Sequence, residues 1–150
     1  MRIAIASDHA AFALKAELAA HLREAGHDVT DLGPETADSV DYPLFGYELS
    51  EAIASGSADK GVALCGSGIG ISIAVNRNPA CRCARVDEPL SATLARQHND
   101  ANVIAMGARL IGPEMARACV DAFLASDFLG DRHQRRVDQL SNPVALQEPA

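Results

Sequence analysis

Residues 64–72 read Leu-Cys-Gly-Ser-Gly-Ile-Gly-Ile-Ser, a run that joins the end of an apolar strand to the start of a helix. Glycines alternate here at 66, 68 and 70, and glycine adopts backbone conformations that residues with a Cβ avoid. Several N–H groups can therefore point at one small anion beside Cys65, and such a loop favours the thiolate form of a neighbouring cysteine. The run predicts either a reactive thiol beside an anion cradle or a tight turn around a structural cysteine.

The run matches none of three well-known phosphate-binding loops. A dinucleotide-binding loop needs a third glycine where Ile71 stands, and a Walker A loop ends in Gly-Lys-Ser or Gly-Lys-Thr. A thiol phosphatase loop has an arginine at the helix start, where this chain has Gly-Ile-Ser at 70–72. The loop by itself therefore names no reaction and leaves both interpretations open.

Short apolar segments alternate with helical patterns on both sides of the loop. Strands are expected at 2–6, 28–32, 61–65, 82–86 and 102–106. Helices are expected at 10–25, 43–54, from the loop to 76, at 89–98, from 113 onward and at 132–140. This alternation predicts the α/β class, as a Rossmann-like three-layer αβα sandwich with a five-stranded parallel sheet.

Length and composition indicate one ordinary globular domain. The chain has 150 residues, 48% of them hydrophobic and 22% charged, which fits a single domain over 1–140 followed by an extended or disordered tail at 141–150. A formal net charge of −7 without a basic surface run argues against nucleic-acid binding. The apolar start of the sequence is too short for a signal peptide, and no segment reaches membrane-span length, so a cytoplasmic protein is expected.

The cysteines do not have the spacing of a zinc site. They stand at 65, 81, 83 and 119 without paired CxxC motifs, and free thiols are expected in a reducing compartment. Cys81 and Cys83 alternate along a predicted strand and share one side of it, which ordinary packing explains. No metal site is predicted.

Polar residues follow three of the predicted strands. Asp8 and His9 follow the first, Cys65 closes the third, and Arg109 follows the fifth. Because ligands of open parallel sheets bind beyond the carboxyl ends of the strands, these groups are candidates for one site. Asp8 can also serve as a helix cap, which would leave His9 merely exposed.

His98 is a candidate on the fourth predicted helix. It continues the spacing of Leu90 and Leu94, which turns it inward and is typical of a core histidine. The neighbouring Asn99 and Asp100 can instead make it part of a polar pocket wall. Both interpretations stay open.

A basic cluster lies near the end of the chain. Arg132 and Arg136 are four residues apart, so on a helix they share one face and can hold a single phosphate group. A solvated basic face has the same pattern.

Taken together, these motifs make the chain similar to the ribose-5-phosphate isomerase B family, which includes the galactose-6-phosphate isomerase subunits. The order and spacing of the motifs over almost the whole chain carry the resemblance. The matching segments are Ser-Asp-His-Ala at 7–10, Asp-Tyr-Pro at 41–43, Cys-Gly-Ser-Gly-Ile-Gly-Ile-Ser at 65–72, Glu-Pro at 88–89, Arg-Gln-His-Asn-Asp-Ala-Asn at 96–102, Gly-Ala-Arg at 107–109 and Arg-His-Gln-Arg-Arg-Val at 132–137.

The resemblance implies an aldose–ketose isomerase of the pentose phosphate pathway that interconverts ribose 5-phosphate and ribulose 5-phosphate without a metal or cofactor. It also implies a homodimer or tetramer with active sites at subunit interfaces. Cys65 would be the base that moves a proton between C2 and C1, and His98 would open the furanose ring. The enediolate would be held by the amides of Gly66, Gly68, Ile69 and Gly70, with Ser67 assisting. The sugar would be positioned by Asp8, Tyr42 and Asn99, and the phosphate bound by His9, Arg109, Arg132 and Arg136.

Two alternatives remain at this point. The same reaction on a six-carbon aldose 6-phosphate, such as allose or galactose 6-phosphate, fits equally, since nothing in the sequence measures pocket length. A non-catalytic sugar-phosphate-binding subunit is disfavoured, because Cys65 and His98 are both present. The chain departs from the family at Ser67, where some members have threonine, and in the charged residues Arg85 and Asp87. Some branches of the family use a carboxylate base, and Cys65 places this chain in the thiol branch.

Overall fold

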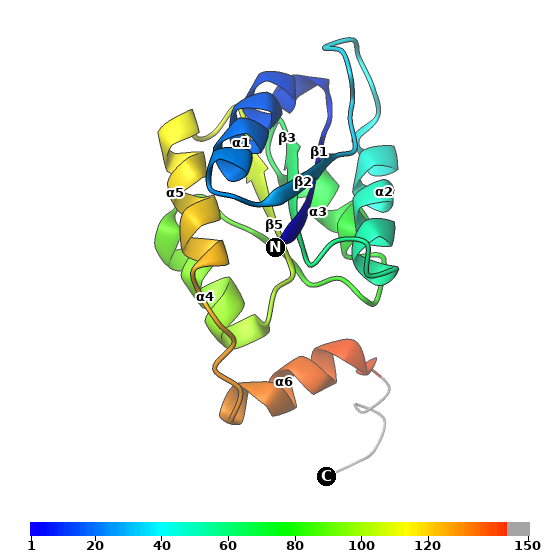
Figure 1. The fold of residues 1–150 in the computed structure, drawn as a ribbon. Coiled ribbons are helices and arrows are strands. Elements are labelled where there is room, and N and C mark those ends of the chain that lie inside the picture. Colours follow the sequence, from blue (N-terminus) through cyan, green and yellow to red (C-terminus); the bar gives the residue numbers. More distant parts are fainter. Residues whose placement is uncertain (144–150) are drawn as a thin grey trace.

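Five short strands form one parallel sheet at the centre of the computed structural model, which describes residues 1–143 (Figure 1). The strands are β1 (Arg2–Ser7), β2 (Asp28–Asp31), β3 (Lys60–Cys65), β4 (Cys83–Arg85) and β5 (Val103–Gly107). Their order is β2-β1-β3-β5-β4, and every neighbouring pair is parallel. The predicted α/β class and five-stranded parallel sheet are confirmed.

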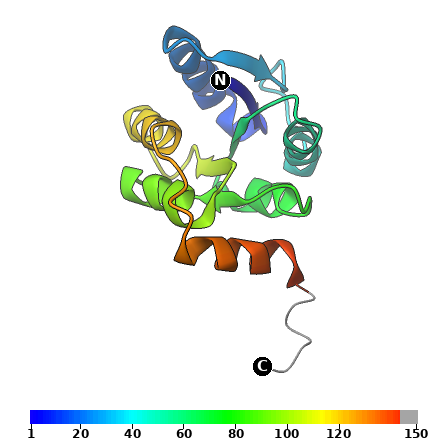
Figure 2. The same ribbon diagram turned by 60° about the horizontal axis from the view of Figure 1, so that its bottom comes forward.

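Helices cover both faces of the sheet. They are α1 (Phe12–Glu24), α2 (Tyr42–Ala54), α3 (Ile69–Val75), α4 (Pro89–Asn99), α5 (Pro113–Leu124) and α6 (Arg132–Ser141), with a 3-10 turn η1 (His9–Ala11) before α1. Helices α1, α4 and α5 pack on one face and α2 and α3 on the other, which gives three layers (Figures 1 and 2).

Side chains alternate in direction along each strand, so successive core residues pack on opposite faces of the sheet. In β1, Ile3 and Ile5 pack toward α1 and α5, while Ala4 and Ala6 pack toward α2 and α3. Full burial of one such isoleucine stabilises the fold by about 1.5–3 kcal/mol relative to an exposed position. Cys65, at the end of β3, belongs to the face covered by α2 and α3.

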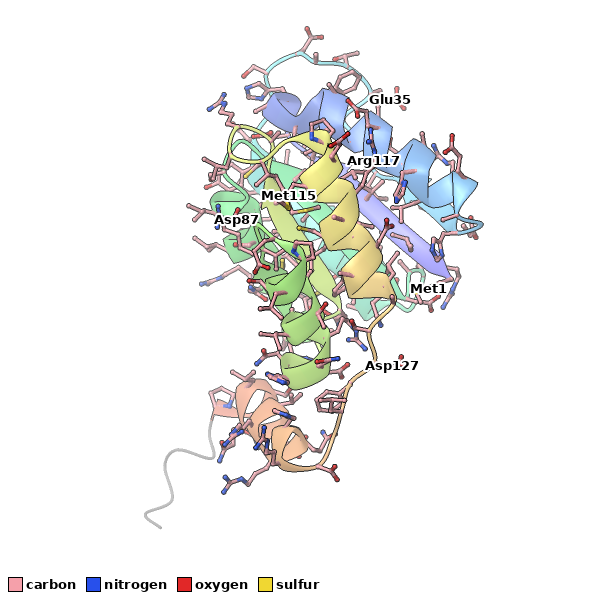
Figure 3. All side chains as sticks on the ribbon, turned by 90° about the vertical axis from the view of Figure 1, so that its left-hand side faces the viewer. Met1, Glu35, Asp87, Met115, Arg117 and Asp127 are labelled. Carbon is pink, nitrogen blue, oxygen red and sulfur yellow. The ribbon has the colours of Figure 1, made fainter. Side chains whose placement is uncertain are left out.

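Helix α4 turns a different face to the core than its spacing predicts. In α4 the buried residues include Ala92 and Ala95, whereas Leu90 is 64% exposed. In α5, Ala116 is buried and Met115 points outward at 43% exposure (Figure 3). Small alanines on the inner face let α4 and α5 approach each other closely, and the larger side chains are left at the margin. The predicted inward stripe of α4 was therefore wrong.

Helix α6 lies apart from the sandwich, beyond the end of α4 (Figure 1). The segment before it runs past α4, where Leu129 N–H donates to Gln97 O at 3.1 Å. Its inner side chains His133 and Val137 are buried. Ser141, where the predicted tail was expected to start, still belongs to this helix, and the rest of that prediction at 144–150 lies outside the described residues. Among residues 1–143, no helix has the length and apolar character needed to span a membrane.

Candidate active site

The Cys65 thiol lies at the carboxyl end of β3 with the glycine loop folded around it. Cys65 is 4% exposed, and the N–H of Gly68 donates to its Sγ at 3.1 Å. Gly68 has φ of 75°, and a Cβ there would lie 2.7 Å from the carbonyl carbon of Met106. Only glycine fits this position, because both the conformation and the close approach exclude a side chain. The loop thus holds a backbone donor against the sulfur.

The turn after β5 holds the glycine loop through two backbone hydrogen bonds. Ala108 N–H donates to Cys65 O at 2.9 Å, and Arg109 N–H donates to Gly66 O at 3.0 Å. The exposed Arg109 side chain lies over Gly66, where a Cβ would be 3.2 Å from a guanidinium nitrogen. A fixed loop with a cation above it is suited to an anionic ligand.

Asp8 and His9 lie beside the loop and also hold the backbone. Asp8 N–H donates to Leu64 O at 3.1 Å, which places Asp8 next to the end of β3. Its carboxylate accepts from Ala10 N–H at 3.0 Å, so Asp8 caps η1 as one interpretation predicted. His9 Nδ1 lies 3.2 Å from the backbone of Val40, so it is tied to the loop before α2.

Tyr42 closes the other side of the loop. Its ring lies against Gly70, where a Cβ would come within 2.5 Å of a ring carbon, and Tyr42 remains 40% exposed. Ser67 Oγ accepts from Ile69 N–H at 3.2 Å. Two of the predicted oxyanion donors, the amides of Gly68 and Ile69, therefore already have partners within the loop.

A second group of predicted site residues gathers where α4 and α6 meet. The His98 ring stacks on the ring of His133, with centroids 4.3 Å apart and an angle of 10° between the planes. His98 is half-buried and belongs to neither of the two core clusters. Asn99, Arg132 and Arg136 are exposed beside it. These side chains form a cationic, accessible surface.

The structure does not bring these two groups together within one chain. Arg82, just before β4, donates to Asn99 O at 3.2 Å, so the end of α4 lies at the amino edge of the sheet. Cys65 pairs with Gly107 at the opposite edge, four residues or about 13 Å along the strand from that end. Asp87, near the start of α4, likewise lies far from α6 (Figure 3). One substrate molecule cannot contact both groups of a single chain.

Arg85 lies beside the glycine loop and His133 lies beside His98, and neither was predicted from the sequence as a site residue. Arg85 Nε donates to Ser67 O at 2.8 Å, so the unusual charge at the end of β4 contacts the loop. His133 stacks on His98, and its spacing of four from the apolar Val137 is the pattern that could have identified it as inward-facing. Burial lowers the pKa of His133, and nearby His98, Arg132 and Arg136 lower it further.

The other cysteines differ from Cys65 in their surroundings. Burial raises the pKa of Cys81 and of Cys119 to about 11 and also raises that of Cys83. At neutral pH these three side chains are protonated thiols, which are poor nucleophiles and bases. Among residues 1–143, no group of three or more His, Cys, Asp or Glu side chains is placed to hold a metal ion.

An α/β domain whose parallel sheet ends in a thiol, an amide-rich loop and an exposed arginine has the site of an enzyme or binding protein for a small anionic substrate. The chain belongs to the ribose/galactose isomerase family, whose sequence model matches residues 3–140.

Named relatives cover nearly the whole chain. Ribose-5-phosphate isomerase B of Escherichia coli is 44% identical over 93% of this chain and 94% of its own. D-erythrulose-4-phosphate isomerase of Pectobacterium atrosepticum is 38% identical over 93% of each chain. The solved structure of Clostridium thermocellum ribose-5-phosphate isomerase B superposes with a TM-score of 0.95 at 41% identity, covering 99% of this chain and 100% of that one.

Proposed function

We propose that this protein is an aldose–ketose isomerase that interconverts ribose 5-phosphate and ribulose 5-phosphate, with Cys65 as the base. The observation that carries the proposal is the thiol of Cys65 held beside an amide-rich loop at the sheet edge. Similarity to ribose-5-phosphate isomerase B over nearly the full chain supports the choice of substrate.

The proposed reaction begins with ring opening and continues through an enediolate. His98 transfers a proton to the ring oxygen as the bond from C1 to that oxygen breaks, and the C1 hydroxyl gives up its proton to solvent, which leaves the C1 aldehyde. The Cys65 thiolate then removes the proton from C2 and returns it to C1, while the hydroxyl proton moves from O2 to O1 near Ser67. Negative charge develops on oxygen in between, and loop amides such as those of Gly66 and Gly70 stabilise it. Loss of one donor of this kind costs about 10²–10³ in rate.

The phosphate end of the substrate is assigned to basic side chains. Arg109 lies over the loop, and the exposed Arg132 and Arg136 share one side of α6. Guanidinium groups bind phosphate through paired hydrogen bonds. Together with His9 they orient the sugar, and Asp8, Tyr42 and Asn99 contact its hydroxyl groups. Binding energy taken from the phosphate end positions the reacting carbons.

The proposal includes a homodimer in which each site is shared. His98, Arg132 and Arg136 lie at the opposite end of the sheet from Cys65, which supports a site to which a second copy contributes them. A two-fold dimer provides this exchange twice, since the same surface of each copy meets its counterpart. A cytoplasmic location is part of the same proposal, as is chemistry that needs no metal.

The named relatives also point to sugar phosphates with a different number of carbons as substrates. One of them is named for a four-carbon sugar phosphate, so the family fold accommodates substrates shorter than ribose 5-phosphate. Six-carbon aldose 6-phosphates are the corresponding longer alternative. The ratio of kcat/KM values among these sugars decides the preference.

The test is turnover in heavy water. The purified full chain is incubated with ribose 5-phosphate, allose 6-phosphate or D-erythrulose 4-phosphate in the presence of a chelator. We expect ribulose 5-phosphate to form fastest and to carry solvent deuterium at C1. Failure to convert any of the three sugars would exclude the enzyme, and inhibition by the chelator would exclude the metal-free reaction.

A further inference from the structure

One peptide group connects Arg85 to the Cys65 thiol. The carbonyl of Ser67 accepts a hydrogen bond from Arg85 Nε at 2.8 Å. The N–H of the same peptide, which belongs to Gly68, donates to Cys65 Sγ at 3.1 Å. Arg85 keeps its other contact with Asp87, whose carboxylate lies 2.7 Å from the guanidinium. Arg85 is thus hydrogen-bonded to the carbonyl of the same peptide whose N–H faces the Cys65 sulfur.

We propose that Arg85 is a positioning residue for the Cys65 base, acting through the Ser67–Gly68 peptide. This inference rests on the proposed function, in which Cys65 is the base. Neither the fold nor the proposed chemistry accounts otherwise for a cation at this loop position.

The planar Ser67–Gly68 peptide links the position of Arg85 to the direction of the Gly68 N–H. A peptide group is planar, with its C=O and N–H pointing in opposite directions. When Arg85 fixes the Ser67 carbonyl, it also fixes the direction of the Gly68 N–H. Gly68 has a positive φ and lies tightly against Met106, so the loop has little freedom to adopt another arrangement once this bond is made.

The Arg85 guanidinium also polarises the Ser67–Gly68 peptide. A guanidinium bound to a carbonyl draws electron density toward the oxygen and makes the N–H of the same peptide a stronger donor. A hydrogen bond to the charged form of a group favours that form. Arg85 therefore strengthens the donor that faces the Cys65 sulfur without touching the sulfur.

Other charged and titratable groups face the same loop. Asp8 lies at the end of β1 and Arg109 lies over the loop after β5, and Tyr42 and His9 border the site. Asp87 partly neutralises the outer side of the Arg85 guanidinium but leaves Nε on Ser67. Of these groups, Arg85 is the one whose hydrogen bond reaches the peptide that donates to the sulfur.

The test measures the reactivity of Cys65 directly. Iodoacetamide alkylation of Cys65 is followed by peptide mass spectrometry from pH 6 to pH 10 in wild type, R85M, R85K and R117M. Arg117 pairs with Glu17 between α5 and α1, so R117M is a matched arginine control away from the loop. Peptide mapping separates Cys65 from the other three cysteines, Cys81, Cys83 and Cys119.

R85M is expected to react about three- to tenfold more slowly than wild type at pH 7, the effect of one ordinary hydrogen bond, and to reach the wild-type rate at high pH. R85K restores most of the rate, because an ammonium can also donate to the Ser67 carbonyl. R117M behaves like wild type. In the isomerase assay, R85M lowers kcat and leaves KM nearly unchanged. Should R85M not fold, R85Q takes its place with the same slower alkylation, since a neutral amide polarises the peptide less.

Three results would overturn the inference. A folded R85M with the wild-type alkylation profile would leave Arg85 as a loop support only. A rise in KM without a fall in kcat would mean that Arg85 binds substrate directly. Slow alkylation in R117M as well would make the effect non-specific. Alkylation needs no turnover, so an active C65A enzyme would reject Cys65 as the base while the link between Arg85 and the thiol is still measured.

Discussion

At the carboxyl edge of the sheet the functional groups are held by backbone contacts, whereas at the amino edge they project as side chains from α6 and the end of α4. Cys65 receives an N–H from its own loop, and the loop rests on the turn after β5. His98 is held by one stacked ring, and Arg132 and Arg136 are exposed. The first edge is preorganised within one chain.

This difference explains how one small domain can carry a divided site. Backbone donors must be fixed in place before charge develops, which a sheet edge and a glycine loop accomplish. Long cationic side chains need only reach the phosphate, so they can come from a separate copy of the chain. We expect the two edges to respond differently when each is changed.

The largest expected effect comes from the thiol itself. Replacement of Cys65 by alanine removes the proposed base and should lower kcat by about 10²–10⁴, the usual contribution of a general base. Cys119→Ala, in the buried face of α5, is the matched control and should keep its turnover. Steady-state kinetics with ribose 5-phosphate measures both. A folded C65A enzyme with nearly normal kcat would place the base elsewhere.

The proposed sharing of each site between two chains predicts the next largest effect. C65A and H98N are each expected to be inactive, but a mixture unfolded and refolded together should recover about one quarter of wild-type activity. Half of the dimers are then mixed, and one of the two sites in each has both intact residues. Refolded C65A and H98N alone are the controls. If the mixture is as inactive as its components, Cys65 and His98 do not meet across an interface.

Much of the fold could be predicted because it depends on local pattern. Apolar runs such as 61–65 mark buried strands, and the glycines after Cys65 mark a tight turn. The site at the carboxyl edge follows from these elements, since parallel strands end together. Asp8, Cys65 and Arg109 accordingly lie around one loop.

Tertiary contacts were not predictable in the same way. Leu90 and Leu94 have core spacing, but the small side chains of Ala92 and Ala95 give α4 its closest packing surface. The position of α6 depends on a ring stack and on Leu129, neither of which leaves a periodic pattern. The contact of Arg85 with Ser67 joins residues 18 apart in the sequence, so only the folded structure reveals it.

The smallest expected effect concerns the pH dependence of the amino edge. Burial lowers the pKa of His133 below its ordinary value of 6.5, so the unfolded chain binds this proton more readily than the folded one. Above pH 6.5 the His133 ring is neutral in both states and does not lower the free energy of unfolding. As the pH falls below that value toward the folded pKa, the unfolded chain takes up the proton first and the fold loses stability. We expect wild type to lose more stability than H133F between pH 8 and about pH 5.

Urea unfolding across this pH range measures the difference. Phenylalanine keeps an aromatic ring against His98 but cannot take up a proton, so H133F should have a flatter stability profile. Activity should follow the same order, because α6 carries the proposed phosphate ligands Arg132 and Arg136. Parallel profiles for the two proteins would show that the His98–His133 stack has no role in the pH response.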